Sequence, residues 1–224
     1  MDGTRTASKQ VIEQIRREFF NGMEPGTPLG TEGELAEQFN VSRITVRDAV
    51  RSLEAMGIVE VRVGARGGVR IAQSDLTVFS DALAVQAHLL GVEWSEITEA
   101  MRLIEPQAAR LAAERAEESD IARLEELVEA QRAAKHDPET FRVFAADFHS
   151  AIAESTGNRP LYVALKALRT SEERLLIPSA VPRIADEVIA SHAELCEAIR
   201  AADADEAERL MTEHLRADAE DQPR

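Results

Sequence analysis

The sequence predicts a mainly α-helical protein in two parts: an N-terminal winged helix-turn-helix of three helices and a β-hairpin wing, and a C-terminal antiparallel helical bundle. Apolar residues recur at helical spacing through most of the chain. Residues 58–72 break this pattern, because two β-branched runs flank a glycine-rich stretch there, which is typical of a hairpin. We therefore expect domains over residues 1–73 and 79–224, joined by a linker at 74–78.

Local signals place the helices of the first part. Ile12, Ile15 and Phe19 share one face of an expected helix over about 8–20. Thr31, followed three residues later by Glu34, predicts a capping box at the start of a second helix. Ser42 is suited to cap a third helix that runs to about Met56. Helix, helix, turn, helix and wing, in that order, is the arrangement of a winged helix-turn-helix.

The second part reads as helical almost throughout, with short breaks. Short connections between long amphipathic helices are typical of an antiparallel bundle. The expected helices lie at about 79–90, 94–116, 119–135, 138–156, 159–176, 183–202 and 204–219.

The charge of the chain is unevenly distributed. The net charge is −15, but residues 1–75 hold 10 of the 26 Lys and Arg and 11 of the 41 Asp and Glu residues, so the remainder is the strongly acidic part. A contact with a phosphate backbone must therefore come from the first part. No apolar run approaches 18 residues and no secretory leader is recognisable, so we expect a soluble, cytoplasmic protein. The single cysteine, Cys196, is expected to be a small core residue.

Arginines are concentrated in residues 41–72, whereas the rest of the chain is acidic. Arg43, Arg47 and Arg51 recur every four residues along the third helix, which predicts a basic stripe able to enter a DNA major groove. Hydroxyls of Ser42 and Thr45 could contact phosphates or base edges. The wing adds Arg62, Arg66 and Arg70, with glycines that allow a close approach to the duplex. The alternative is that these arginines only solvate a small helical domain.

Residues 28–72 resemble the DNA-binding domain of the GntR family of bacterial transcription regulators. The segments that carry the resemblance are "PLGTEGELAEQF", "VSRITVR", "LEAMG" and "GARGGVRIA". The resemblance implies operator contacts from Ser42, Arg43, Thr45 and Arg47, and a wing tip near Gly67 in the minor groove. Together with Arg66, these are the predicted DNA-binding residues. One position departs from the family, because Gly33 stands where a DNA-contacting arginine is usual, and we expect modestly lower affinity from its loss.

Three histidines fall on apolar helix faces in the second part. They are His149, His192 and His214, each on a different expected helix. A single such histidine is most often a core residue satisfied by a hydrogen bond. Three on separate helices of one bundle could instead converge on a divalent transition metal, for which imidazole nitrogen is a suitable ligand. The residues alone leave both alternatives open.

The second part resembles the FCD effector domain of the FadR subfamily. The segments are "MRLIEPQAARLAAERA", "FHSAIAESTGN" and "SHAELCEAIRAADADEAERLMTEHL". The resemblance implies a metal held by one Asp and three His, and the histidines match as His149, His192 and His214. The Asp position is Ala145, and Asp147 lies about 200° away around the helix. We therefore expect a site for a divalent transition metal, zinc or nickel, that is weakened by Ala145.

Arg102 and Glu105 lie one helical turn apart and have two interpretations. One is a surface ion pair. The other, implied by the resemblance, is that Arg102 points into a cavity beside the metal and binds an effector carboxylate, for which its guanidinium is suited.

These features predict a ligand-responsive transcription regulator, a repressor, that binds a palindromic operator as a homodimer and senses a small organic acid. One winged domain offers little contact surface, so two are expected to act on a twofold-symmetric site. A metal-dependent hydrolase is the rival hypothesis, since a three-histidine metal could activate water. No general base or nucleophile motif accompanies the histidines, so we expect no enzyme. An adaptor that uses the bundle only for protein contacts is a third alternative.

Overall fold

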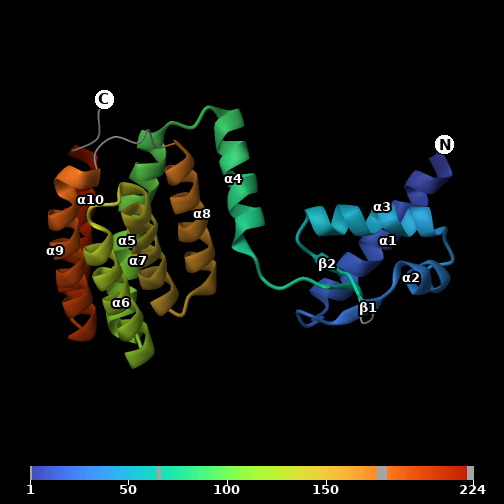
Figure 1. Cartoon of the computed structure of the whole chain (residues 1–224), viewed down its shortest axis with the longest axis horizontal. Helices are drawn as coiled ribbons and strands as arrows, with labels where there is room; N and C mark the ends of the chain where they lie inside the picture. The colour runs from blue at the N-terminus through green and yellow to red at the C-terminus, as the bar shows by residue number, and fades with distance from the viewer. Residues whose placement is uncertain (1, 65–66, 176–180, 221–224) are drawn as a thin grey trace. The chain divides into compact units, whose positions relative to one another are not determined.

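The chain is seen in a computed structural model that describes residues 2–64, 67–175 and 181–220. It divides into two units, Met1–Val78 and Phe79–Arg224. The elements, labelled in Figure 1, are α1 (Asp2–Phe20), β1 (Pro28–Gly30), α2 (Glu32–Gln38), α3 (Arg43–Ala55), β2 (Val59–Arg62), β3 (Gly68–Ile71), α4 (Leu76–Leu90), α5 (Trp94–Arg115), α6 (Glu118–Ala134), α7 (Pro138–Ser155), α8 (Arg159–Leu175), α9 (Val181–Arg200) and α10 (Ala204–Glu220).

The first unit has the predicted winged helix-turn-helix fold. α1 and α3 pack together over a core to which α2 and the strands contribute, with Val46, Ala49 and Leu53 fully buried. The predicted hairpin is present, since β2 and β3 pair antiparallel with Val61 opposite Val69. A third strand, β1, adds to the free side of β3 and was not predicted. It lies in a segment rich in glycine and proline and is only three residues long, which is too short to show an alternation of apolar and polar residues in the sequence.

The local helix signals of the first unit are confirmed. Thr31 Oγ1 accepts a hydrogen bond from Glu34 N at 3.2 Å, and Glu34 Oε2 accepts one from Thr31 N at 2.7 Å. Ser42 Oγ likewise accepts from Thr45 N at 3.1 Å and caps α3. Between the two helices Asn40 adopts a left-handed conformation with φ of 52°, which an asparagine tolerates better than most residues. These contacts fix the angle at which α3 leaves α2.

The second unit is helical, as predicted. The seven helices expected there agree with α4 to α10 within three residues at every end. The largest difference at the start is α4, which begins at Leu76 inside the stretch expected to be a linker. Asp75 explains this early start, because its side chain accepts a hydrogen bond from Thr77 N at 2.8 Å.

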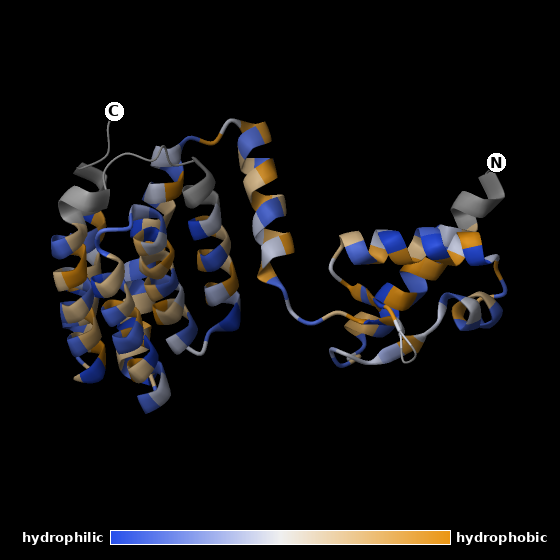
Figure 2. Cartoon of the chain, in the orientation of Figure 1, coloured by the Kyte–Doolittle hydropathy of each residue, from blue (hydrophilic) through white to orange (hydrophobic). Residues whose placement is uncertain are grey.

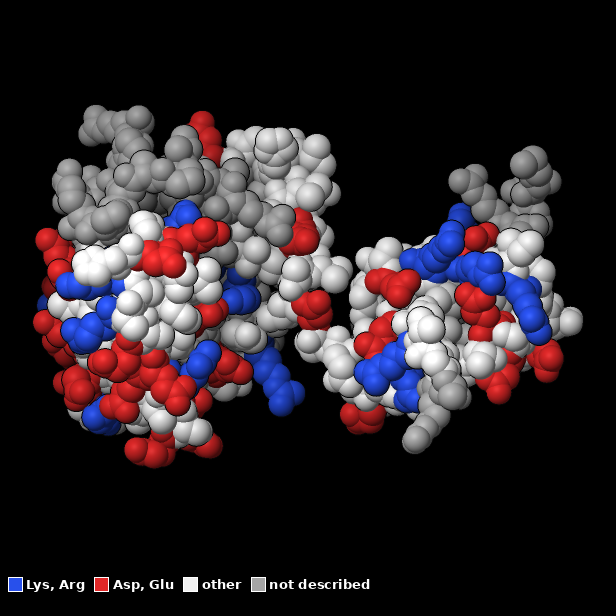
Figure 3. Space-filling view, in the orientation of Figure 1, with Lys and Arg blue, Asp and Glu red and all other residues white. Residues whose placement is uncertain are grey.

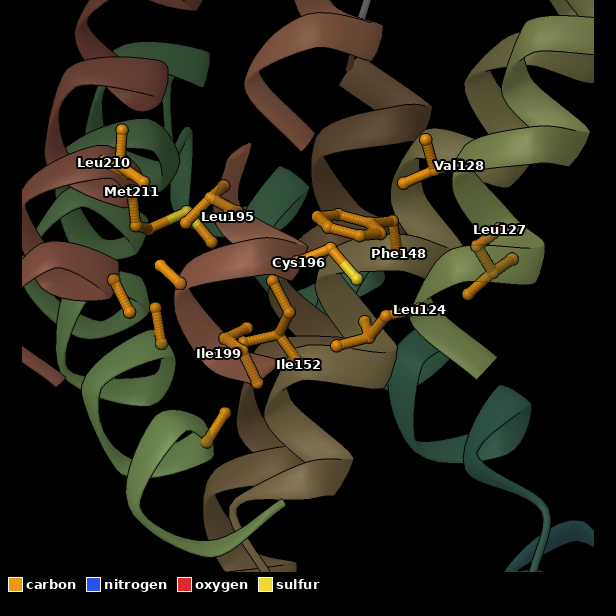
Figure 4. Close-up of a cluster of buried hydrophobic side chains, with 14 of the residues drawn as sticks. Leu124, Leu127, Val128, Phe148, Ile152, Leu195, Cys196, Ile199, Leu210 and Met211 are labelled. Carbon is orange, nitrogen blue, oxygen red and sulfur yellow. The ribbon is translucent and has the colours of Figure 1, made fainter. Parts of the chain in front are cut away.

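The core of the second unit lies between the helices α5, α6, α7, α9 and α10. Figure 4 shows its centre, where Phe148 of α7 lies near Leu195 and Ile199 of α9. Hydropathy alternates along most helices in the manner of amphipathic elements (Figure 2). None of the described helices combines the length and apolarity that are needed to cross a bilayer.

Candidate functional site

The exposed face of α3 carries the arginines that the sequence singles out. Its opposite face is buried in the first unit through Thr45, Val46, Ala49, Val50 and Leu53. Arg43, Arg47 and Arg51 are exposed. Figure 3 shows basic side chains gathered over α3, whereas acidic side chains dominate the visible face of the second unit. The cationic surface of the first unit therefore lies on the helix that was predicted to enter the groove.

The two residues with predicted hydroxyl contacts lie in different surroundings. Ser42 is exposed, but Thr45 is only 3% exposed, and its Oγ1 lies 2.8 Å from Ser42 Oγ. Thr45 contributes to the structure that starts α3, because its backbone N–H is the group that Ser42 caps. The contact of its hydroxyl with DNA stays a prediction.

Arg47 is held in place by an acidic neighbour. Its Nη2 lies 2.9 Å and its Nε 3.1 Å from Glu32 Oε2, a contact between α3 and the start of α2. The hydrogen bond and the charge of Glu32 raise the pKa of Arg47. The pair is exposed, so a phosphate oxygen can compete with Glu32 for the guanidinium at little cost.

Gly33, the departure from the family pattern, lies beneath another arginine of α3. A Cβ added at Gly33 would stand 3.3 Å from Nη2 of Arg43. Because Gly33 has no side chain, the guanidinium of Arg43 can lie directly over it. The two positions therefore share one piece of surface, and a residue introduced at 33 must displace the end of Arg43.

The wing has a tip that accepts only glycine at one position. Gly67 N donates a hydrogen bond to Gly64 O at 2.8 Å, and a Cβ at Gly67 would lie 2.4 Å from the carbonyl oxygen of Arg62. Arg66, a predicted DNA contact, lies outside the described residues.

The other wing arginines have local partners. Arg62 pairs with Glu60 on the same strand. Arg70 is half-buried and donates to Gly26 O at 3.1 Å, so it supports the sheet instead of extending toward a ligand.

The three predicted histidines converge in the core of the second unit. His149 comes from α7, His192 from α9 and His214 from α10, and all three are buried. The Nε2 atom of His214 lies 3.2 Å from Nε2 of His149 and 3.2 Å from Nε2 of His192. Two nitrogens bound to one zinc ion at about 2.0–2.1 Å in tetrahedral geometry would be about 3.3 Å apart. Two of the three Nε2 separations therefore match this spacing, and one ligand atom from each ring lies within 4.8 Å of the other two, so the three histidines could bind a metal.

The outer nitrogens of two of these rings are fixed by neighbouring side chains. His149 Nδ1 lies 2.7 Å from Glu105 Oε2, and His192 Nδ1 lies 2.8 Å from Gln131 Oε1. The amide nitrogen of Gln131 faces the carbonyl oxygen of Phe144 at 3.4 Å, which directs its oxygen toward His192. Both acceptors therefore require a proton on Nδ1 and leave a lone pair on each Nε2.

A count of protons shows why this arrangement suits a cation. With Nδ1 protonated in neutral His149 and His192, neither of their Nε2 atoms carries a hydrogen. One Nε2–H on His214 can be donated fully to only one of them, and the other contact then brings two lone pairs to 3.2 Å. A divalent cation would give the Nε2 lone pairs of His149 and His192 a partner, and that of His214 as well once its proton is on Nδ1, with acceptors behind two of the rings as is usual for metal-bound histidine.

Behind His149 lies a buried ion pair that the sequence did not reveal. Arg169 Nη2 of α8 donates to Glu105 Oε2 at 2.7 Å, and both side chains are nearly inaccessible. Burial alone would raise the pKa of Glu105, but the charges of Arg169 and His149 outweigh it and lower this pKa to about 2. Glu105 is therefore ionised, and its Oε1 is buried without a hydrogen-bond partner among the described residues.

The remaining predicted residues of the site lie in different surroundings. Arg102 is exposed on the single chain while Glu105 is buried, so they do not form the surface ion pair considered above, and the guanidinium beside the histidines is that of Arg169. Ala145 packs partly buried against the core. Asp147 pairs with Lys166 at 3.3 Å and is not a substitute carboxylate, as the helical angle predicted. The effector role of Arg102 stays a prediction.

Two site residues were missed although the sequence held a signal for each. Gln131 follows Leu124, Leu127 and Val128 on the buried stripe of α6. Arg169 follows Leu165 by four residues on a buried face of α8. A polar residue on an apolar stripe must find a partner inside the protein, and this rule could have identified both.

Comparison with known proteins assigns each unit to a family description. Residues 7–71 match "Bacterial regulatory proteins, gntR family", and residues 96–217 match the FCD domain. The HTH-type transcriptional regulator LutR of Bacillus subtilis is 29% identical over 203 residues, which cover 86% of this chain and 90% of LutR. The galactonate operon transcriptional repressor of Escherichia coli is 31% identical over 217 residues, covering 92% of each chain. The structure of Streptococcus agalactiae GntR has a TM-score of 0.66 at 28% identity and covers 95% of this chain and 96% of that one.

Proposed function

This chain belongs to the GntR family of bacterial regulatory proteins and carries an FCD domain, and from that premise we propose that it is a dimeric, metal-assisted repressor controlled by a small organic acid. It is a DNA-binding transcription regulator and not an enzyme. Repression, the operator, the metal and the effector are the proposed parts. The basic face of α3 supports the proposed operator binding, and the three converging histidines support the proposed metal site.

We propose that α3 lies in the major groove of a palindromic operator. Ser42, Arg43 and Arg47 are the proposed contacts of α3, and Arg66 and Gly67 those of the wing. Exposed guanidinium groups on one helix can bind phosphates or guanine edges, while the acidic second unit would be repelled by the duplex. Arg47 would exchange Glu32 for a phosphate oxygen on binding.

We propose that His149, His192 and His214 hold a divalent transition metal, zinc or nickel. Such an ion supplies an electrophilic centre to which a carboxylate oxygen can bind. The protein orients the rings through Glu105 and Gln131 and excludes water by burial. With Ala145 at the family's aspartate position, the protein ligands are neutral, and we expect weaker metal binding and more room for an effector carboxylate than in relatives that keep the aspartate.

We propose that α4 supplies the dimer interface. Val78, Ala82, Val85 and Leu89 are spaced by four, three and four residues, which places them on one side of the helix. All four are exposed, Leu89 at 72%. The buried side, around Ser80 and Ala87, faces the other way. Figure 2 shows hydrophobic residues recurring along α4. A second copy of the same helix would cover this stripe and bring two α3 helices to one operator.

Effector control then requires two placements of the DNA-binding units with different effector affinities. An acid that binds more tightly to the placement that does not fit the operator would release DNA. The same coupling requires operator DNA to weaken the binding of the acid.

DNA binding is tested by fluorescence anisotropy with a duplex from upstream of the protein's own gene. We expect Arg47→Ala to weaken binding at least tenfold and to lower the dependence of affinity on salt. Arg16→Ala is the matched control, because Arg16 is an exposed arginine of α1 that pairs with Glu13. Equal binding by both variants would refute the role of α3, and absence of binding by the unmodified protein would refute the operator proposal.

Metal and effector are tested together by elemental analysis and thermal shift. We expect about one zinc or nickel ion per chain, lost in His192→Ala, and a rise in Tm with a carboxylic acid that disappears after chelation. A variant that keeps both the metal and the acid response would refute the assignment of His192.

A further inference from the structure

The exposed face of α3 contains one large apolar side chain. Ile44, the second residue of the helix, is 69% exposed. It is surrounded on the helix by charged residues, since Arg43 precedes it and Arg47 and Asp48 lie one turn further on. An isolated exposed isoleucine among charges is not a protein-docking patch, which requires contiguous apolar surface.

The geometry of the helix places Ile44 at the most forward point of this surface. Successive residues rotate by about 100°. The buried residues of α3 define an inward direction, and Ile44 and Arg51 fall within about 15° of the direction opposite to it. Arg43 and Arg47 lie to one side of that line and Asp48 to the other. If α3 enters a groove with its exposed face, Ile44 and Arg51 go deepest.

The chemistry of the major groove limits what an isoleucine can contact there. Base edges in this groove present hydrogen-bond donors and acceptors, together with one apolar group, the C5 methyl of thymine. Isoleucine can neither donate nor accept a hydrogen bond, so the methyl is the feature it can distinguish. We propose that Ile44 determines operator specificity by packing against the C5 methyl of a thymine in each half-site. This inference rests on the proposed placement of α3 in the major groove.

The experiment starts from a random duplex library, from which the unmodified protein selects its preferred sequence. In the selected duplex each thymine of one half-site is then replaced by uracil, which removes the methyl group and keeps every hydrogen-bonding atom. We expect one replacement to weaken binding about fourfold, the ratio that corresponds to the ~0.8 kcal/mol of one buried methyl or methylene group. Replacements at the other thymines should leave affinity within experimental error.

The substitution Ile44→Ala completes the cycle. We expect this variant to bind the thymine and the uracil duplex equally, because the partner of the methyl group is gone. Met56→Ala is the matched control: Met56 is also an exposed apolar residue of the first unit, just beyond α3, and this variant should keep the fourfold preference.

Each outcome decides the proposal. A fourfold effect that vanishes only in Ile44→Ala establishes the contact. Uracil sensitivity that persists in Ile44→Ala assigns the methyl group to another side chain and overturns it, as does a selected duplex in which no thymine matters. If the unmodified protein selects no sequence at all, the operator proposal itself fails, which is a different result from selective binding without methyl dependence.

Discussion

The amide oxygen of Gln131 lies 2.8 Å from Nδ1 of His192, and both side chains are completely buried. This contact ties α6 to α9 and determines which nitrogen of the imidazole carries the proton. Because Nδ1–H is donated to the amide, the lone pair of Nε2 faces His214 and, beyond it, His149. The direction of one metal-binding lone pair is therefore set by a residue that does not touch the metal position.

Replacing Gln131 with methionine should weaken metal binding while the fold is kept. The acceptor for Nδ1–H is lost in a side chain of similar size, so we expect the Kd for zinc to rise about 10- to 100-fold. Competition with a fluorescent chelator measures it. Gln131→Glu, which keeps an oxygen acceptor, should stay close to the unmodified protein. Equal affinities for the methionine and glutamate variants would show that Gln131 does not position His192.

The stability of the metal-free protein should fall as the pH drops below about 6.5. Burial, followed by the charges of His214 and His149, lowers the pKa of His192 well below its usual value. Below the pKa of the unfolded chain, near 6.5, the unfolded state therefore takes up a proton that the folded state refuses. The expected loss approaches 1.4 kcal/mol per pH unit. Urea unfolding with chelator between pH 7.5 and 5.5 measures it.

This pH range isolates the histidine contribution. The lowered pKa of Glu105 contributes stability that is present above about pH 4.3 and is lost only as the pH falls further toward 2. His192→Gln should flatten the dependence between pH 7.5 and 5.5, whereas His88→Gln, at an exposed position of α4, should not. An unchanged slope in His192→Gln would contradict the assignment.

Glu105→Gln should destabilise the second unit strongly. It removes the carboxylate that faces both Arg169 and His149 in the core, and loss of one member of a buried ion pair is expected to cost about 3–5 kcal/mol. The double variant Glu105→Gln/Arg169→Met removes both charges and should recover a substantial part of that loss. Denaturant unfolding of the chelated protein measures the cycle. Additive losses from the two single changes would show that the pair contributes no coupling.

The sequence predicted what depends on neighbours along the chain. Thr31 and Glu34, or Ser42 and Thr45, lie three residues apart, so their hydrogen bonds follow once a helix begins there. The convergence of three histidines was also predictable, because each one stands on an apolar stripe and buried stripes of one bundle face a common core.

What escaped prediction depends on partners far away in sequence. The partner of His192 is 61 residues earlier and that of Glu105 is 64 residues later, and no spacing rule connects them. Thr45 shows the opposite case. Its position on the buried face of α3 follows from the same periodicity that identified Val46 and Ala49.

Charges on the exposed stripe of α4 should separate the proposed dimer. Val85→Glu/Leu89→Glu places two carboxylates where a second copy would bury an apolar surface, so we expect the mass in solution to fall from about twice the 24.6 kDa of one chain to once this value. Light scattering after gel filtration measures it. His88→Glu introduces a charge at an exposed position about 90° around α4 from the centre of this stripe and should leave the dimer intact. Dissociation by both variants, or by neither, would place the interface elsewhere.

Gly33→Arg tests whether the departure from the family pattern weakens DNA binding or is compensated. The glycine lies in α2, so arginine or alanine in its place should raise stability by about 0.5–1 kcal/mol through helix propensity. The new cation should also raise operator affinity and steepen the slope of log K against log salt by about 0.9. Gly33→Ala provides the matched control, because it gains the propensity without the charge.

The opposite result is equally informative. The guanidinium of Arg43 lies where the new side chain would start, 3.3 Å from its Cβ. If Gly33→Arg binds DNA less tightly than Gly33→Ala, the space above Gly33 is required by Arg43.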